Sequence, residues 1–319
     1  GHAIADATDA ALLGALAIAG REEAERWGSE RAHVTFVAMG RYGGRECSYA
    51  SDADVIALHE PVGGTSDSEA AASATAIVNR VKKLLGSATS QLGIVVDLDL
   101  RPEGKNGPMS RTIASHEEYA QRWSSTWERQ AAVRARPIGS SDLDERARAL
   151  FESMAYREVS ESEVRDIRLL KARMENERLP RGSEPARHVK LGPGGLSDVE
   201  WTIQLIQMRH GARLPALRTP STTRAIAVAR DAGLLAAPDA EILLNAWDLA
   251  TRIRAGNTLA TGRMSGVKLD VLPRDSAELS ALAAILGYGS GGLTALEEDW
   301  LRAARQARNV MERAFWEQQ

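Results

Sequence analysis

Two short apolar runs around a glycine-rich turn constrain the fold of this chain more than any other feature. The first run, Val34–Met39, is rich in β-branched residues, and the second, Val55–Leu58, follows the pair Asp52 and Asp54. The pattern predicts a strand, a glycine turn with a short helix, and a second strand over Val34–His59. Because side chains alternate along a strand, two carboxylates one residue apart point to the same face.

This combination of residues suits a metal-bound polyphosphate. Carboxylate oxygens bind Mg²⁺, and glycines let backbone N–H groups approach phosphate oxygens at the start of a helix. Gly43, Gly44 and Ser51 lie between the two apolar runs. The alternative interpretation is a polar turn whose aspartates cap a helix or face solvent.

The composition excludes several classes of protein. A length of 319 residues allows two domains or one large one. The net charge of −3 argues against a nucleic-acid-binding surface. The single cysteine, Cys47, excludes an internal disulfide and fits a reducing compartment. We find no apolar run near the roughly 18 residues of a membrane span and no signal peptide, so we expect a cytoplasmic protein without membrane contact.

A third strand is expected at Ile94–Leu100, where it places Asp97 and Asp99 on one face. A helix at Glu69–Leu92, ended by Gly93, connects this strand to the second one. A helix between two strands argues for a crossover and hence for parallel pairing. The third strand therefore brings further carboxylates to the sheet.

The rest of the chain is predicted to be nearly all helical. A charged helix is expected at Glu117–Arg136, and Ser141 or Asp142 is expected to cap the next one. We place the domain boundary after Gly139. The predicted fold is α+β, with a small mixed-sheet domain at 1–139 and an all-α helical bundle at 140–319.

A second Gly-Gly pair, Gly194 and Gly195, precedes another predicted helix. Ser197 and Glu200 have the spacing of a capping box at its start. The turn offers a second phosphate-facing loop, but Glu200 as a capping partner is the simpler interpretation. Asp198 and Glu200 diverge on a helix and make a poor pair of ligands.

Four ordered blocks between Gly40 and Trp201 resemble the glutamine synthetase adenylyltransferase family: GRYGGRECSYASDADV, DLDLRPEGKNGP, TWERQAAVRAR and VKLGPGGLSDVEW. Enzymes of this family carry two homologous nucleotidyltransferase halves. One half attaches AMP to a tyrosine of glutamine synthetase, and the other removes it by phosphorolysis.

The resemblance implies a site of two Mg²⁺ ions with ATP as substrate. Asp52 and Asp54 would bridge both ions, and Asp97 would hold the ion near the incoming hydroxyl and act as candidate base. The nucleotide-binding residues that it implies are Gly43, Gly44, Ser51 and Arg101. One departure is Asp99, which stands where the family commonly has arginine.

The block Trp127–Arg136 favours the adenylylating, C-terminal half, and the chain end AFWEQQ resembles a natural C-terminus. The start, without Met and with Gly1 and His2, resembles the remnant of a tag, so we expect an excised part of a longer protein fused to its second half. The family implies glutamine synthetase as the protein substrate, with a PII-type signal protein and glutamine as regulators. Two alternatives stay open: the deadenylylating half, and a non-catalytic regulatory module that binds nucleotide.

Overall fold

The computed structural model describes residues 1–49, 51–86, 93–180, 182–289 and 292–317, which form two compact units. The first unit comprises Gly1–Cys47 and Ser51–Arg157, and the second comprises Glu158–Gln319 with the short piece Ser48–Ala50. The structural division thus falls later in the chain than the boundary expected after Gly139.

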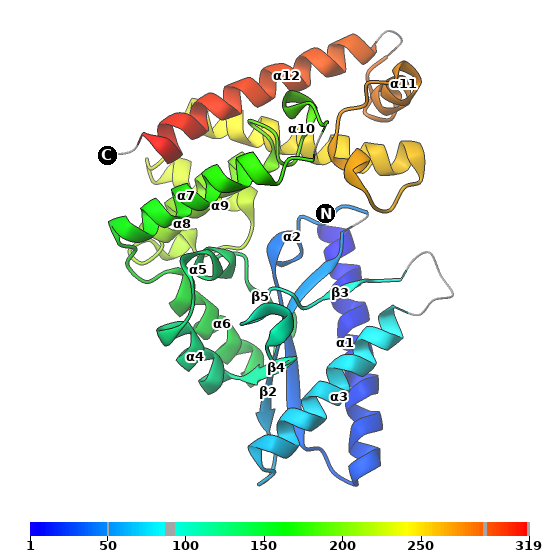
Figure 1. Cartoon of the computed structure of the whole chain (residues 1–319), viewed down its shortest axis with the longest axis vertical. Coiled ribbons are helices and arrows are strands. Elements are labelled where there is room, and N and C mark those ends of the chain that lie inside the picture. Colours follow the sequence, from blue (N-terminus) through cyan, green and yellow to red (C-terminus); the bar gives the residue numbers. More distant parts are fainter. Residues whose placement is uncertain (50, 87–92, 181, 290–291, 318–319) are drawn as a thin grey trace. The chain divides into compact units, whose positions relative to one another are not determined.

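The first unit is built on a small mixed sheet with the strand order β3-β2-β1-β5 (Figure 1). Strand β1 pairs antiparallel with β2 and β5, whereas β2 pairs parallel with β3 and, further along, with β4. The strands are β1 (Ala32–Ala38), β2 (Ala53–Pro61), β3 (Val96–Asp97), β4 (Ser110–Thr112) and β5 (Arg136–Pro137). The expected parallel pairing of the second and third strands is confirmed.

Helices cover both faces of this sheet, which explains why its two long strands are nearly continuous apolar runs. Phe36 and Val55 share a core with Leu12 of α1 (His2–Trp27) and Val78 of α3 (Asp67–Leu85). Helices α1 and α3 lie side by side (Figure 1).

On the other face of the sheet lies α6 (Asp142–Ala155), where Thr35 hydrogen-bonds to Asp144. Ser141 caps α6, as expected, with Asp144 completing a capping box. Because α6 packs against β1 and β5, it belongs to the first unit. This packing is the reason for the later division of the chain.

Two predicted elements are shorter in the structure. Helix α3 ends at Leu85, and Gly86 is its C-cap, so the helix does not continue through Gly86 as expected. The rest of the expected extension, residues 87–92, lies outside the part of the chain that the structure describes. The third strand has only two residues, Val96–Asp97, because the Asp97 carboxylate accepts the Asp99 backbone N–H at 2.7 Å and the chain turns there. Asp99 therefore does not share a strand face with Asp97.

The charged helix expected at Glu117–Arg136 is two helices, α4 (Ile113–Arg122) and α5 (Thr126–Ala132). Ser125 and Glu128 form a capping box that starts α5. Arg136 lies in β5. The break brings the end of this segment back to the sheet.

The second unit is helical, apart from one isolated bridge between His188 and Val271. Its helices are α7 (Glu161–Glu177), α8 (Leu196–His210), α9 (Thr222–Asp231), α10 (Ala237–Thr261), α11 (Ser276–Ile285) and α12 (Gly292–Met311), which a π-helical turn (Glu312–Trp316) extends. Trp300 of α12 and Trp247 of α10 are buried in its core. Figure 1 shows α10 and α12 alongside each other.

By length and hydropathy alone, one described helix, α1, passes as a candidate membrane span. The expectation from the sequence that the chain contains no apolar run of this length is therefore corrected. In the structure α1 packs on α3 and buries Leu12, Ala15 and Ala19 in the core of the first unit.

Candidate active site

The expected carboxylates Asp54 and Asp97 are brought together at the ends of neighbouring strands. In the parallel pairing of β2 with β3, these two residues are register partners. Both are half-buried, whereas Asp52, just before β2, is exposed. Side chains of register partners lie on the same face of a sheet, so the Asp54 and Asp97 side chains leave the sheet on the same face at neighbouring positions.

A glycine that the sequence reading did not single out lies directly beside Asp54. Gly40 follows β1 and has a φ of +52°, a conformation that favours glycine. A Cβ atom at Gly40 would lie 3.1 Å from the Asp54 Oδ2 atom. The Met39 N–H also donates to the Asp54 carbonyl at 2.8 Å. The turn after β1 therefore packs its backbone against the Asp54 carboxylate.

The two glycines that were expected to contact phosphate build this turn instead. In the short helix α2 (Gly40–Gly43), the Gly43 N–H donates to the Met39 carbonyl at 2.7 Å, and the Gly44 N–H donates to the Gly40 carbonyl at 3.2 Å. Their amides are already engaged. Contact of Gly43 and Gly44 with phosphate stays a prediction, and it requires these hydrogen bonds to open.

Gly43 is required for a close approach of two backbones. A Cβ atom there would lie 1.9 Å from the Arg134 carbonyl oxygen and 2.7 Å from that of Ala38. No side chain fits at this position without movement of the chain. Ser51, the other expected residue of this stretch, is half-buried and lies directly before Asp52.

Arg101 is held by the loop that follows β3. It is 9% exposed, and its guanidinium donates to the carbonyls of Leu98 at 2.8 Å and of Gly107 and Lys105 at 3.2 Å each. These bonds fold the loop around the arginine. Its role as a phosphate ligand is a prediction that this arrangement does not favour.

Asp99, the departure from the family pattern, faces cations of the same loop. Its carboxylate lies 3.3 Å from the Lys105 ammonium and 3.9 Å from the Arg101 guanidinium. Lys105 is largely exposed. Asp99 is therefore paired with cations of its own loop.

The carboxylates at the strand ends are the type of ligand that a hard divalent cation needs, but they supply only part of its coordination sphere. Asp54 and Asp97 supply carboxylates at paired positions of neighbouring strands, the ligand type that Mg²⁺ prefers, and Gly40 places no side chain against Asp54. Among the described residues, however, no group of three or more His, Cys, Asp or Glu side chains is gathered closely enough to hold a metal ion. The three expected ligands thus do not form a complete coordination sphere in this structure.

Cys47 lies near this site but behaves as a buried apolar residue. It is 5% exposed, and burial raises the pKa of its thiol. A raised pKa keeps the thiol protonated and lowers its reactivity. Cys47 therefore acts as a small buried apolar side chain.

One groove of the first unit lies away from the carboxylates. Its volume is about 770 Å³, and its lining includes Leu16 and Arg21 of α1, His33 near the start of β1 and Glu60 near the end of β2. The register of β1 and β2 places His33 and Glu60 opposite each other, at the other end of the strands from Ala38 and Val55. The groove therefore does not belong to the acidic site.

The second Gly-Gly turn, in the helical unit, is closed by its own backbone. Helix α8 starts after Gly195 without a side-chain cap, so the expected capping box of Ser197 and Glu200 is wrong. The N–H groups of Gly195, Leu196 and Ser197 donate to loop carbonyls at 2.9 Å each. These amides are not available to a phosphate.

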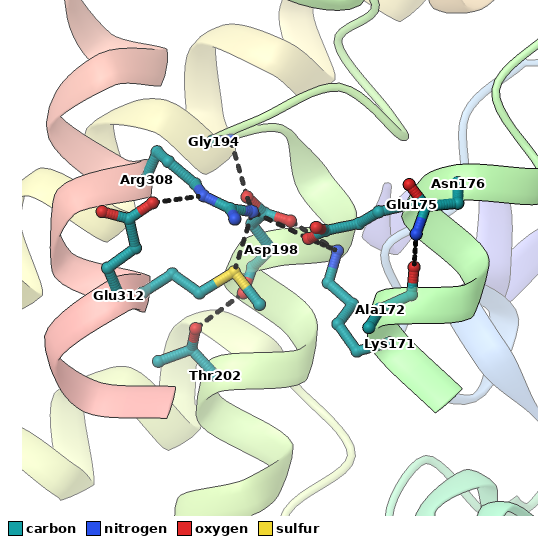
Figure 2. Close-up of polar contacts among 10 residues, drawn as sticks. Lys171, Ala172, Glu175, Asn176, Gly194, Asp198, Thr202, Arg308 and Glu312 are labelled. Atoms are coloured by element: carbon teal, nitrogen blue, oxygen red, sulfur yellow. Dashed lines mark hydrogen bonds and ion pairs between the residues drawn. The ribbon is translucent and has the colours of Figure 1, made fainter. Parts of the chain in front are cut away.

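Asp198 holds this turn instead (Figure 2). It is 1% exposed; its Oδ2 atom accepts the Gly194 N–H at 2.7 Å, and its Oδ1 atom lies 2.5 Å from the Lys171 ammonium. Arg308 of α12 contacts Asp198 at 3.2 Å and Glu175 at 2.7 Å. The turn is a structural junction of α7, α8 and α12.

Comparisons with known proteins agree with this division of the chain. Residues 2–151 match the family model of glutamate-ammonia ligase adenylyltransferase, and residues 168–315 match that of GlnD PII-uridylyltransferase. The two matches follow closely the sheet-containing unit and the helical unit.

Among curated relatives, the bifunctional glutamine synthetase adenylyltransferase/adenylyl-removing enzyme of Streptomyces coelicolor is 44% identical over 99% of the chain, and that of Streptomyces avermitilis is 45% identical over 99%. The enzyme of the same name from Mycolicibacterium smegmatis is 40% identical over 89% of the chain. The chain spans about 31% of the length of the Streptomyces relatives.

The fold thus defines an α-rich α+β protein with an acidic site at the ends of parallel strands. With these matches, the chain belongs to the glutamine synthetase adenylyltransferase family and corresponds to one segment of its longer members.

Proposed function

We propose that this chain transfers AMP from ATP to a tyrosine hydroxyl of glutamine synthetase and releases pyrophosphate. The observation that carries the proposal is the pairing of Asp54 with Asp97 beside the Gly40 turn. This pairing lies within the part of the chain that matches the adenylyltransferase family model. In this proposal the sheet-containing unit, expected over residues 1–139 and extending to Arg157 in the structure, is the nucleotidyltransferase domain, and the helical unit that follows is the second domain.

The chemistry requires a tyrosine oxygen to attack the α-phosphorus of ATP while the bond to the β-phosphate breaks. Pyrophosphate leaves, and the hydroxyl proton passes to a base. Asp97 is the proposed base, because a tyrosine hydroxyl has a pKa of about 10 and ionises little at neutral pH. A carboxylate at a strand end is fixed by the sheet, which holds it in one orientation.

Asp52, Asp54 and Asp97 are the proposed ligands of Mg²⁺. Bound Mg²⁺ neutralises negative charge on the phosphates. The chain's part is to hold the carboxylates together, which the β2–β3 register does for Asp54 and Asp97. Gly43, Gly44, Ser51 and Arg101 remain proposed contacts of the triphosphate.

The reverse chemistry is the second candidate, because the relatives' name includes an adenylyl-removing activity. In that case phosphate attacks adenylyl-tyrosine and ADP leaves. We favour transfer to tyrosine because the segment Trp127–Arg136 resembles the adenylylating half. The helical unit, which matches a PII-uridylyltransferase model, is the proposed receiver of regulation by a PII-type protein and glutamine, in a cytoplasmic enzyme.

The test is a transfer of label from ATP carrying labelled α-phosphate to purified glutamine synthetase with Mg²⁺. We expect label on the synthetase with the parent chain and a loss of about 1,000-fold with Asp54→Asn, because a metal ligand contributes several kcal/mol to the transition state. Asp248→Asn, on an exposed part of α10, is the control and should keep full activity.

Pre-adenylylated synthetase with inorganic phosphate forms the second arm of the assay. Release of ADP there, with no transfer in the first arm, would assign the chain to the deadenylylating reaction. Inactivity of the parent chain in both arms would reject catalysis by this segment alone.

A further inference from the structure

Two arginines of the segment after α5, the buried Arg134 and the half-buried Arg136, hold the turn that faces Asp54. Arg134 is 3% exposed, and its Nε atom donates to the Gly40 carbonyl at 3.0 Å. Its Nη2 atom lies 2.6 Å from the Glu46 carboxylate, which is itself buried. Arg134 thus ties the first residue of α2 to the chain that leaves the turn.

The backbone of Arg134 holds the other end of the same turn. Its carbonyl oxygen occupies the space that a side chain at Gly43 would need, 1.9 Å from the Cβ position. One residue therefore contacts α2 twice: through its guanidinium at Gly40 and through its carbonyl at Gly43. This double contact leaves the turn little room to shift.

Arg136 secures the turn from the side of α1. Its Nε atom donates to the Gly43 carbonyl at 3.1 Å, and its two Nη atoms contact the Asp9 carboxylate at 2.8 and 2.9 Å. The same carboxylate accepts the Tyr42 hydroxyl at 2.6 Å. Both arginines are therefore engaged with the protein, although each is a cation close to the proposed nucleotide site.

We propose that Arg134 is a positioning residue for Asp54. It holds the Gly40 backbone against the Asp54 carboxylate, where a Cβ atom would lie 3.1 Å from Oδ2, and so fixes the orientation in which Asp54 meets a divalent cation. The inference rests on the proposed function and assigns Arg134 to the support of a metal ligand.

A purely structural role predicts a different result. A buried Arg–Glu pair contributes to folding wherever it lies, and its loss would lower stability without changing the affinity of the folded protein for metal. Groups that orient a metal ligand instead change metal affinity, by about 10–100-fold when they are mutated. Metal affinity measured beside stability therefore separates the two roles.

The first experiment compares Arg134→Lys with Arg129→Lys. Lysine keeps a positive charge towards Glu46 but has no Nε–H to donate to Gly40. Arg129 is the matched control because it is 2% exposed, lies in α5 and donates to the backbone carbonyls of Met154 and Arg157, not to the turn. Mn²⁺ binding, followed by electron paramagnetic resonance in the presence of ATP, and the thermal midpoint are measured on both variants.

We expect Arg134→Lys to weaken Mn²⁺ binding by about 10–100-fold. We expect Arg129→Lys to lower the thermal midpoint by a similar amount but to keep the Mn²⁺ affinity within about 2-fold of the parent. Equal Mn²⁺ affinity of the two variants would overturn the inference. So would a parent chain that binds no Mn²⁺.

A second pair of variants covers the case in which Arg134→Lys does not fold. Gly40→Ala places a Cβ atom against Asp54, whereas Gly63→Ala carries nearly the same backbone strain, at a φ of +58°, with no atom within 4 Å of its Cβ position. We expect only Gly40→Ala to weaken Mn²⁺ binding. Equal effects at the two positions would count against the turn as a support of Asp54.

Because Mn²⁺ binding needs no protein substrate, the two proposals fail separately. A parent chain that binds Mn²⁺ and ATP but transfers no AMP would reject the proposed function and leave the positioning role to be decided by the variants. A parent chain that transfers AMP, with an unchanged metal affinity in Arg134→Lys, would reject the positioning role alone.

Discussion

At the scale of single residues, the acidic site depends on glycines as much as on carboxylates. Gly40 gives Asp54 a neighbour without a side chain, and Gly43 lets two backbones meet. The sequence indicated the pair Gly43 and Gly44 for phosphate contact, yet their amides close the α2 turn. Gly40, the glycine that lies against the Asp54 carboxylate, belongs to the same glycine-rich stretch of the sequence. A spacing of glycines does not reveal which amide is paired, because the pairing depends on the path of the chain.

Gly43→Ala is expected to lower the free energy of unfolding by about 1–3 kcal/mol or more, because a Cβ atom would lie 1.9 Å from the Arg134 carbonyl and overpack the turn. Chemical denaturation measures the change. Gly14→Ala is the control, since nothing lies within 4 Å of its Cβ position in α1, and it should raise stability by up to about 1 kcal/mol. A Gly43→Ala protein as stable as the parent would contradict the close approach.

His116 is expected to make stability depend on pH. It is 2% exposed against Phe151 and Tyr119, and burial lowers its pKa to about 4, with nearby Arg111 adding to the effect. Between pH about 6.5 and about 4 the unfolded chain binds a proton that the folded chain does not, so stability falls as pH falls through this window.

The slope from one such group is at most about 1.4 kcal/mol per pH unit. Denaturation of the parent and of His116→Leu at pH 7, 6 and 5 measures it, and the variant should lose less stability on acidification. Parallel curves for the two proteins would exclude His116 as the cause.

At the scale of elements, apolar periodicity predicted where most helices and the two long strands lie. The periodicity failed to predict the bounds of an element where a side chain hydrogen-bonds to the backbone and so ends or starts that element. Strand β3 stops at Asp97 because the carboxylate accepts the Asp99 N–H, and the expected helix at Glu117–Arg136 divides because Ser125 and Glu128 cap a new start. The second signal was present in the sequence as a capping-box spacing. The end of β3 depends on a local hydrogen bond between Asp97 and Asp99, which the apolar periodicity does not predict.

The junction of α7, α8 and α12 is expected to depend on Asp198. Asp198→Ala leaves the buried Lys171 ammonium without its contact at 2.5 Å, and loss of one partner of a buried pair costs about 3–5 kcal/mol. Asp248→Ala is the control: its pair with Arg252 is exposed and 3.8 Å long, and such pairs contribute about 0–1 kcal/mol. Equal stability of the two variants in urea would show that the junction contributes little.

At the scale of the whole molecule, two units with separate cores match two different family models. The α+β organisation and the parallel β2–β3 pair were predictable, because the connecting helix implies a crossover. The boundary was not predictable, since α6 joins the first unit through its contacts with β1, which lies far from it in the sequence. Strand alternation predicted that Asp52 shares a face with Asp54 and that Asp97 shares a face with Asp99, whereas the structure pairs Asp54 with Asp97 through the β2–β3 register. The use of Arg101 by loop carbonyls also depends on a fold that spacing does not specify.

The central claim is that the carboxylates at the strand ends bind ATP through Mg²⁺. Isothermal titration of ATP into the parent chain and into the Asp52→Asn, Asp54→Asn double variant, with Mg²⁺ and with EDTA, tests it without a protein substrate. We predict binding by the parent only with Mg²⁺ and an affinity at least about 100-fold lower in the variant, since several kcal/mol of metal-mediated attraction is lost. Equal affinity in the two proteins, or binding by the parent that persists in EDTA, would contradict the account.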